Sequence, residues 1–108
     1  MCELAEAGHV GVRIDETAVP VDGPVRAACS FLGLDPFAVA NEGTLVAFVG
    51  ADDAGRVLER MRLVPEAANA VVIGDVVDTH PGTVVALTSL GGTRVVLLPL
   101  GEQLPRIC

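Results

Sequence analysis

The segment Thr83–Leu98, TVVALTSLGGTRVVLL, contains two β-rich runs separated by a short connection. The runs Thr83–Thr88 and Thr93–Leu98 are rich in valine and threonine, a composition typical of β-strands. Ser89–Gly92 joins them with two consecutive glycines, which favours a hairpin turn. A phosphate-binding loop at Gly91–Thr93 is disfavoured, because the motif is too short and no helix follows to hold the anion. The sequence therefore predicts an antiparallel hairpin here.

Upstream of this hairpin, the spacing of apolar residues predicts a series of helices and strands. We expect strands over residues 10–14, 44–49 and 70–77. We expect helices over residues 1–7, 24–32 and 36–39, and a further helix that begins at Asp52 or Asp53 and ends before Pro65. This order, with the late hairpin, predicts an α+β fold. It would have a mainly antiparallel sheet with helices packed on one face.

The clearest helix signal lies between Asp22 and Gly33. Asp22 is the expected N-cap, Pro24 suits the first turn, and Gly33 is expected to end the helix. Helical spacing places four apolar residues on one face: Val25, Ala28, Cys29 and Leu32. We therefore expect a buried stripe, in which the Cys29 thiol has a packing role.

The length of 108 residues and the hydrophobic fraction of 51% predict one folded domain. We assign residues 1–100 to this domain and residues 101–108, GEQLPRIC, to a mobile tail. Pro105 removes a backbone donor and favours extended geometry before it, so we expect neither a helix nor a central strand there. Cys108 would then lie at the tip of an accessible arm.

The charge balance narrows the classes of partner. The chain carries 14 acidic residues, seven arginines and no lysine, for a net charge of −7. Nucleic acid and anionic membranes are therefore poor partners, and Schiff-base chemistry on a lysine of this chain is excluded. No apolar run approaches the roughly 20 residues that a membrane helix needs. The N-terminal residues carry acids where a signal peptide would carry positive charge, so we expect a cytoplasmic protein.

The cysteines and histidines do not follow a metal-binding pattern. Cys2, Cys29 and Cys108 are odd in number and lack CxxC spacing, which argues against a disulfide framework and a zinc site. His9 and His80 have no second ligand at a suitable spacing, so we interpret them as exposed turn residues. We accordingly predict no metal site and no cofactor bound by these residues alone.

Two residues remain candidates for chemistry, each with a simpler alternative. Cys108 is either a terminal residue without a role or an accessible nucleophile, whose thiolate Arg106 would favour. Glu42, in the polar junction Asn41–Gly43, either satisfies backbone donors before the expected strand or acts as a general acid or base. The residues themselves leave both choices open.

Several motifs taken together resemble one known family. They are Glu16 with Pro20-Val21, LGLDP at residues 32–36, ANEG at 40–43, Ile73-Gly74, GGTR at 91–94 and PRIC at 105–108. These motifs, which span nearly the whole chain, resemble the C-terminal domain of the HypE family of hydrogenase maturation factors. This family is part of the superfamily of aminoimidazole ribonucleotide (AIR) synthetase, selenophosphate synthetase and thiamine-monophosphate kinase. The terminal PRIC is the most specific of the motifs.

The resemblance implies a mechanism. The carbamoyltransferase HypF would place a carbamoyl group on Cys108, and ATP-dependent dehydration would convert it to a thiocyanate. Cyanide would then pass through the HypC–HypD complex to the iron of [NiFe] hydrogenase. By motif position, Glu42 would assist proton removal, with Asp35, Pro36, Asn41 and Gly43 shaping the substrate loop around it. Pro105, Arg106 and Ile107 would form the tail that carries the thiol.

The family also has an N-terminal domain, which supplies most of its ATP and magnesium site and which these residues do not contain. The resemblance therefore implies that residues 1–8 are a truncated inter-domain helix and that the chain alone neither hydrolyses ATP nor makes thiocyanate. One alternative is a free-standing carrier or docking module for the carbamoyltransferase. Another is the corresponding domain of a relative such as selenophosphate synthetase, which the terminal cysteine disfavours.

Overall fold

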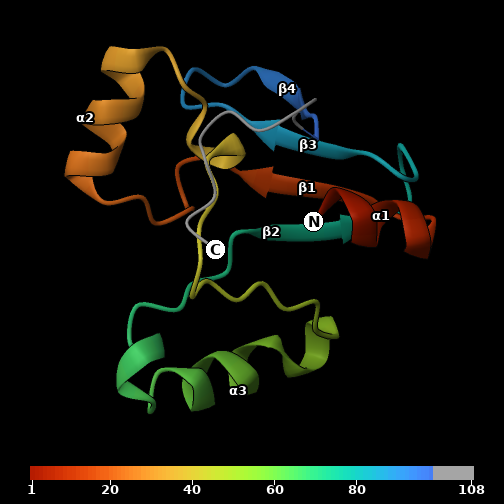
Figure 1. Cartoon of the computed structure of the whole chain (residues 1–108). Helices are drawn as coiled ribbons and strands as arrows, with labels where there is room; N and C mark the ends of the chain where they lie inside the picture. Colours follow the sequence, from red (N-terminus) through yellow and green to blue (C-terminus); the bar gives the residue numbers. More distant parts are fainter. Residues whose placement is uncertain (99–108) are drawn as a thin grey trace.

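A computed structural model describes residues 1–98 of the chain (Figure 1). Its elements, in chain order, are α1 (Cys2–Gly8), β1 (Gly11–Asp15), α2 (Gly23–Leu32), the 3-10 turn η1 (Pro36–Ala38), α3 (Ala51–Met61), the 3-10 turn η2 (Pro65–Ala67), β2 (Gly74–Val77), β3 (Val84–Leu87) and β4 (Thr93–Val96). The predicted tail, with Pro105, Arg106, Ile107 and Cys108, lies outside the described residues. In the part of the chain described, no helix combines the length and apolarity needed to cross a membrane.

The four strands form one mixed sheet in the order β2-β1-β3-β4. β1 is antiparallel to β2 and parallel to β3, whereas β3 and β4 form the predicted antiparallel hairpin. Gly91, in the connecting turn, has a φ of 81°, a left-handed conformation that glycine adopts without strain. The α+β class is confirmed, with two of the three strand pairings antiparallel.

The core lies on one face of the two central strands. Residues two apart share a face of a strand, and the buried hydrophobic residues of β1 and β3 follow this rule: Val12, Ile14, Val84 and Ala86. The buried Ala5 of α1 packs against them. Ile14 lies opposite Ala86, and Ala86 lies opposite Arg94 on the edge strand β4. An arginine therefore continues the row of core-facing positions to the sheet edge.

Several local predictions are confirmed. Gly33 ends α2 in a left-handed conformation with a φ of 68°. Asp22 occupies the N-cap position of α2, although its side chain makes no capping hydrogen bond. His9 and His80 are exposed residues with positive φ values of 51° and 44° in the connections that follow α1 and β2.

The predicted strand over residues 44–49 is wrong. Its apolar composition suits a strand, but a strand requires a neighbour to complete its ladder of hydrogen bonds. No segment within residues 1–98 pairs with it, and Leu45 and Phe48 are exposed. The expected strand over residues 70–77 is shortened for the same reason, because only Gly74–Val77 pairs with β1.

The predicted burial of the α2 stripe is also wrong for most of its residues. Cys29 is 5% exposed, as expected, but Val25 and Leu32 are 47% and 62% exposed. The reason is that α2 packs against the short turn η1 and does not lie flat on the sheet. Figure 1 shows α2 at the margin of the sheet and α3 set apart from it, beyond β2.

The start of α3 differs slightly from the prediction. Gly50 is its N-cap, and Asp52 and Asp53 lie in the first turn. There the carboxylates interact favourably with the positive end of the helix dipole without capping it. The helix ends at Met61, before Pro65 as predicted.

Candidate functional site

The candidate site begins in the loop of residues 34–43, which follows α2. Asp35 is the N-cap of η1, and its Oδ1 accepts a hydrogen bond of 3.0 Å from the backbone N–H of Phe37. Pro36 follows in the first position of the turn, where its fixed φ and missing N–H are well tolerated. Aspartate followed by proline is therefore a local signal for this turn.

The same aspartate is held from the sheet by Arg94 of β4. Arg94 Nη1 donates to Asp35 Oδ2 at 2.7 Å, and Nη2 donates to Asp35 Oδ1 at 3.2 Å. Arg94 Nε donates to Glu16 Oε2 at 3.1 Å. A guanidinium can serve both carboxylates because it presents five N–H donors in one plane. Glu16, Asp35 and Arg94 therefore link the end of β1, the start of η1 and the edge strand β4.

Partial burial makes this contact electrostatically significant. The three side chains are each about one-third exposed, at 33% for Arg94, 36% for Asp35 and 34% for Glu16. Hydrogen bonding to Asp35, partly opposed by burial and reinforced by Glu16, raises the pKa of Arg94 above its ordinary value. The guanidinium charge is thus matched by two carboxylates at a position that faces the core side of the sheet.

Phe37 completes the cluster by placing its ring next to the guanidinium of Arg94. The Arg94 Cζ atom lies 5.1 Å from the centroid of the Phe37 ring, within the range of a cation–π interaction. Phe37 also packs against the buried core of β1 and β3. We call Glu16, Asp35, Phe37 and Arg94 the loop anchor. Through it, η1 is fixed to the sheet by an ion pair, a ring contact and apolar packing.

The structure brings only some of the predicted site residues together. Asp35 and Pro36 lie at the loop anchor, whereas Asn41, Glu42 and Gly43 follow in an exposed turn. Gly43 has a φ of 77°, a conformation that side chains other than glycine rarely adopt. Because residues 44–49 are not a strand, Glu42 does not stand at a strand edge as expected. It lies in a turn that leads to an unpaired segment.

Glu16 and Arg94 were not among the candidate residues, although both lie in the motifs of the sequence. A signal was available in the alternation of β4. Arg94 and Val96 share a face because residues two apart in a strand point the same way. Since Val96 continues an apolar series, an arginine on its face requires a carboxylate partner.

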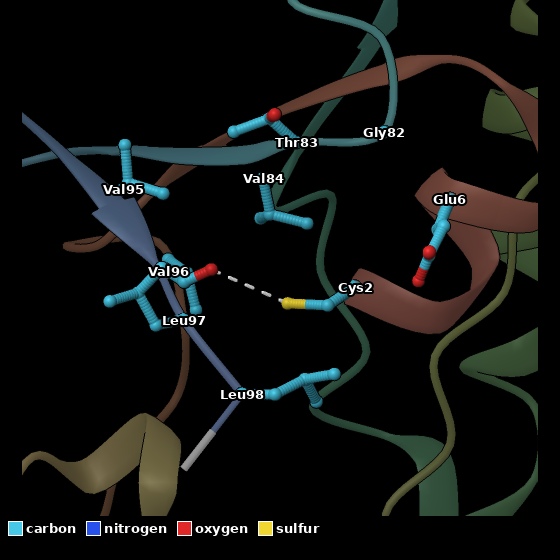
Figure 2. A pocket seen from close by; sticks show the side chains of 9 residues that line it. All are labelled: Cys2, Glu6, Gly82, Thr83, Val84, Val95, Val96, Leu97 and Leu98. Carbon is cyan, nitrogen blue, oxygen red and sulfur yellow. Dashed lines mark hydrogen bonds between the residues drawn. The ribbon is translucent and has the colours of Figure 1, made fainter. Parts of the chain in front are cut away.

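A separate hollow lies between α1 and the β3–β4 hairpin (Figure 2). Its volume is about 200 Å³, and its lining is mostly apolar: Cys2, Glu6, Gly82, Thr83, Val84, Val95, Val96, Leu97 and Leu98. The Cys2 thiol donates to the backbone carbonyl of Val96 at 3.4 Å. The lining contains no basic side chain, so it does not suit a phosphate group.

Comparisons with known proteins place the chain in a family. Residues 1–86 match the model of the family described as AIR synthase related protein, C-terminal domain. The chain is 52% identical over 106 residues to the carbamoyl dehydratase HypE of Azotobacter vinelandii. That alignment covers 98% of the chain but 31% of the relative. The chain thus spans about one-third of the length of the curated relative.

Solved structures with more than 25% sequence identity have the same fold. A crystal structure of the hydrogenase maturation protein HypE has a TM-score of 0.90 and 42% identity over 99% of this chain and 35% of that one. A crystal structure of HypE in complex with ATP has a TM-score of 0.86 and 42% identity, over 99% of this chain and 33% of that one. A crystal structure of a HypE–HypF complex has a TM-score of 0.83 and 36% identity, over 91% of this chain and 32% of that one.

Proposed function

The chain belongs to the family of AIR synthase related proteins through their C-terminal domain, and on this premise we propose that it is the thiol-carrying part of a HypE-type carbamoyl dehydratase acting in hydrogenase maturation. The observation that carries the proposal is the 52% identity to a carbamoyl dehydratase HypE across 98% of the chain. The terminal PRIC, residues 105–108, supplies the thiol that such a reaction needs.

In this proposal the sulfur of Cys108 is the covalent carrier. HypF would transfer to it a carbamoyl group that originates from carbamoyl phosphate: the thiol would lose its proton and a carbon–sulfur bond would form as the bond from the carbamoyl carbon to its activated donor breaks. HypF is the partner present in one of the similar structures. The carbamoyl group would then lose its oxygen and both nitrogen protons, leaving a thiocyanate on sulfur. The sulfur–carbon bond would then break and return Cys108 as a thiolate, with an electron pair from the acceptor, the HypC–HypD complex, forming the new bond to the cyano carbon. The cyanide would pass from this complex to the iron of [NiFe] hydrogenase. Pro105, Arg106 and Ile107 would present the thiol to these partners in turn.

Glu42 would accept a proton from the carbamoyl nitrogen. A carboxylate is a suitable base when the acidity of the N–H rises as the carbon–oxygen bond breaks. Glu42 is exposed in its turn, so a substrate carried by another segment has access to it. Asn41 and Gly43 flank it, and Asp35 and Pro36 fix the start of its loop at the anchor. The chain would thus contribute both the carried substrate and a group that acts on it.

ATP and magnesium would be held mainly by parts of the protein beyond this chain. The oxygen of the carbamoyl group requires activation as a leaving group, for which ATP is the co-reactant in the proposal, and one similar structure is a HypE in complex with ATP. Within residues 1–98, however, no group of three His, Cys, Asp or Glu side chains is placed to hold a metal ion. These residues do not fit a complete nucleotide–metal site. We therefore expect no ATP hydrolysis by the chain alone.

Intact-mass spectrometry tests the carrier role. The chain is incubated with HypF, carbamoyl phosphate and ATP, and the mass of one carbamoyl group is expected to be added. The gain should disappear in Cys108→Ala and persist in Cys2→Ala, which removes a partly exposed thiol instead. A full-length HypE relative serves as the positive control for HypF activity. A gain that persists in Cys108→Ala, or no gain while the control is modified, would overturn the proposal.

A further inference from the structure

The loop anchor joins the two segments that the proposed reaction must coordinate. Asp35 begins the loop in which Glu42 lies seven residues later. Arg94 lies in β4, the last strand within residues 1–98, and Cys108 follows it in the sequence by 14 positions. Their side chains meet through two hydrogen bonds, of 2.7 and 3.2 Å. The strand leading to the substrate-carrying residue therefore contacts the start of the loop that carries the expected base.

The connection between the anchor and Glu42 is short. Ala38 donates to the backbone carbonyl of Asp35 at 2.9 Å, which closes η1. Glu42 is only four positions after Ala38, a span of roughly 13 Å when fully extended. A displacement of η1 therefore changes where Glu42 can lie. Since the surrounding residues 40–43 are exposed, burial of the turn itself contributes little to fixing it.

Resting on the proposed function, we propose that Arg94 is a positioning residue for the dehydration: by holding Asp35 and Phe37 against the sheet, it fixes the loop that presents Glu42. The role requires an arginine in particular. A lysine would retain the charge but has no planar fork to bind both oxygens of Asp35 and reach Glu16 as well. The substitution would also remove the planar guanidinium, whose Cζ atom lies 5.1 Å from the centroid of the Phe37 ring. Arg94→Lys is therefore the informative variant.

The first experiment uses the chain itself. Amide hydrogen exchange and ¹⁵N relaxation are measured by NMR in the parent, in Arg94→Lys and in Arg13→Lys. Arg13 is the matched control because it pairs with Asp75 at 3.3 Å on the exposed face of the same sheet. We expect faster exchange at Phe37 and Ala38 and lower order at Glu42 in Arg94→Lys only. Unchanged exchange and order in Arg94→Lys would overturn the positioning role without bearing on the carrier role of Cys108.

The second experiment measures the reaction in a full-length HypE-type protein that contains this sequence. Cys108 is first carbamoylated by HypF, and thiocyanate formation with ATP is then followed. We expect Arg94→Lys to lower kcat by about 10- to 100-fold, the scale of a displacement near 1 Å, with the KM for ATP and the extent of carbamoylation unchanged. Arg13→Lys should retain the parent rate.

Measuring the effect of Arg94→Lys a second time, in a protein that already carries Glu42→Gln, distinguishes a positioning role of Arg94 from general destabilisation. If Arg94 acts through Glu42, adding Arg94→Lys to Glu42→Gln should slow the reaction little further. An equal slowing in both backgrounds would overturn the proposal, since it would show that Arg94 acts independently of Glu42. A carbamoylated parent protein that forms no thiocyanate would instead overturn the proposed function, whatever the loop measurement gives.

Discussion

The energetic strength of the loop anchor can be predicted from its geometry. A double-mutant cycle with Asp35→Asn and Arg94→Met measures the coupling of the pair. Asparagine retains an oxygen that can accept from the Phe37 N–H, and methionine retains an apolar stem. The cycle therefore isolates the charged hydrogen bonds better than alanine substitutions would, because replacing an N-cap by alanine alone costs about 1 kcal/mol.

The expected coupling lies between two limits. Fully exposed ion pairs contribute about 0.2–1 kcal/mol, whereas hydrogen bonds to charged groups contribute about 1.5–3 kcal/mol. Arg94 and Asp35 are about one-third exposed and make two hydrogen bonds. We therefore expect a coupling of about 1–2 kcal/mol after allowance for solvent screening. Arg94→Met alone should be more harmful than Asp35→Asn alone, because it leaves the carboxylates of both Asp35 and Glu16 without their cation.

A second cycle on the same sheet provides the control. Arg13 and Asp75 make one contact of 3.3 Å, and their side chains are 60% and 67% exposed. Their coupling should be below about 0.5 kcal/mol. Both cycles are measured by urea unfolding followed by far-UV circular dichroism, at low and high salt. Salt should reduce the exposed pair's coupling by the larger fraction. Equal couplings in the two cycles, or a larger one for Arg13–Asp75, would refute the argument from burial and bidentate geometry.

Two further predictions concern backbone packing and ionisation. A Cβ at Gly74 would overlap the Arg13 carbonyl oxygen, so Gly74→Ala should lower the free energy of unfolding by about 1–3 kcal/mol. Gly55 lies in open space within α3, so Gly55→Ala should raise the free energy of unfolding by about 0.5–1 kcal/mol in the same denaturation assay. Hydrogen bonds from the Thr17 hydroxyl and backbone N–H lower the pKa of Asp15. The ionised carboxylate therefore stabilises the folded state at pH values above the pKa that Asp15 has in the unfolded chain, and this stabilisation is lost as the pH falls through its lower pKa in the folded state. Thr17→Val should raise the pKa of Asp15 towards its ordinary value in a carboxyl NMR titration, and an unchanged pKa would contradict the assigned cause.

Features governed by neighbouring residues could be predicted from the sequence. The β3–β4 hairpin follows from two β-rich runs around Gly91, and the end of α2 follows from Gly33. The turn at Asp35-Pro36 is equally local, because the capping carboxylate and the N–H it binds are two residues apart. In each case the residues that determine the conformation lie within a few positions of it.

Features that depend on distant partners could not be predicted in this way. The parallel pairing of β1 and β3 joins segments separated by α2, α3 and β2. The segment 44–49 has the composition of a strand, but composition does not reveal whether a neighbour is available to pair with it. The apolar spacing of α2 likewise gives no information on what covers its stripe, and most of that stripe is exposed in the described residues.

Asp35 shows how local and distant requirements can fix one residue type. As the N-cap of η1 it could be replaced by asparagine, serine or threonine, which also accept a backbone N–H. As the partner of Arg94, 59 residues away, it must carry a negative charge and two equivalent oxygens. Glutamate meets the second requirement, but its longer side chain is not a favoured N-cap. Aspartate meets both, so the LDP motif of residues 34–36 reflects the turn and the sheet contact together.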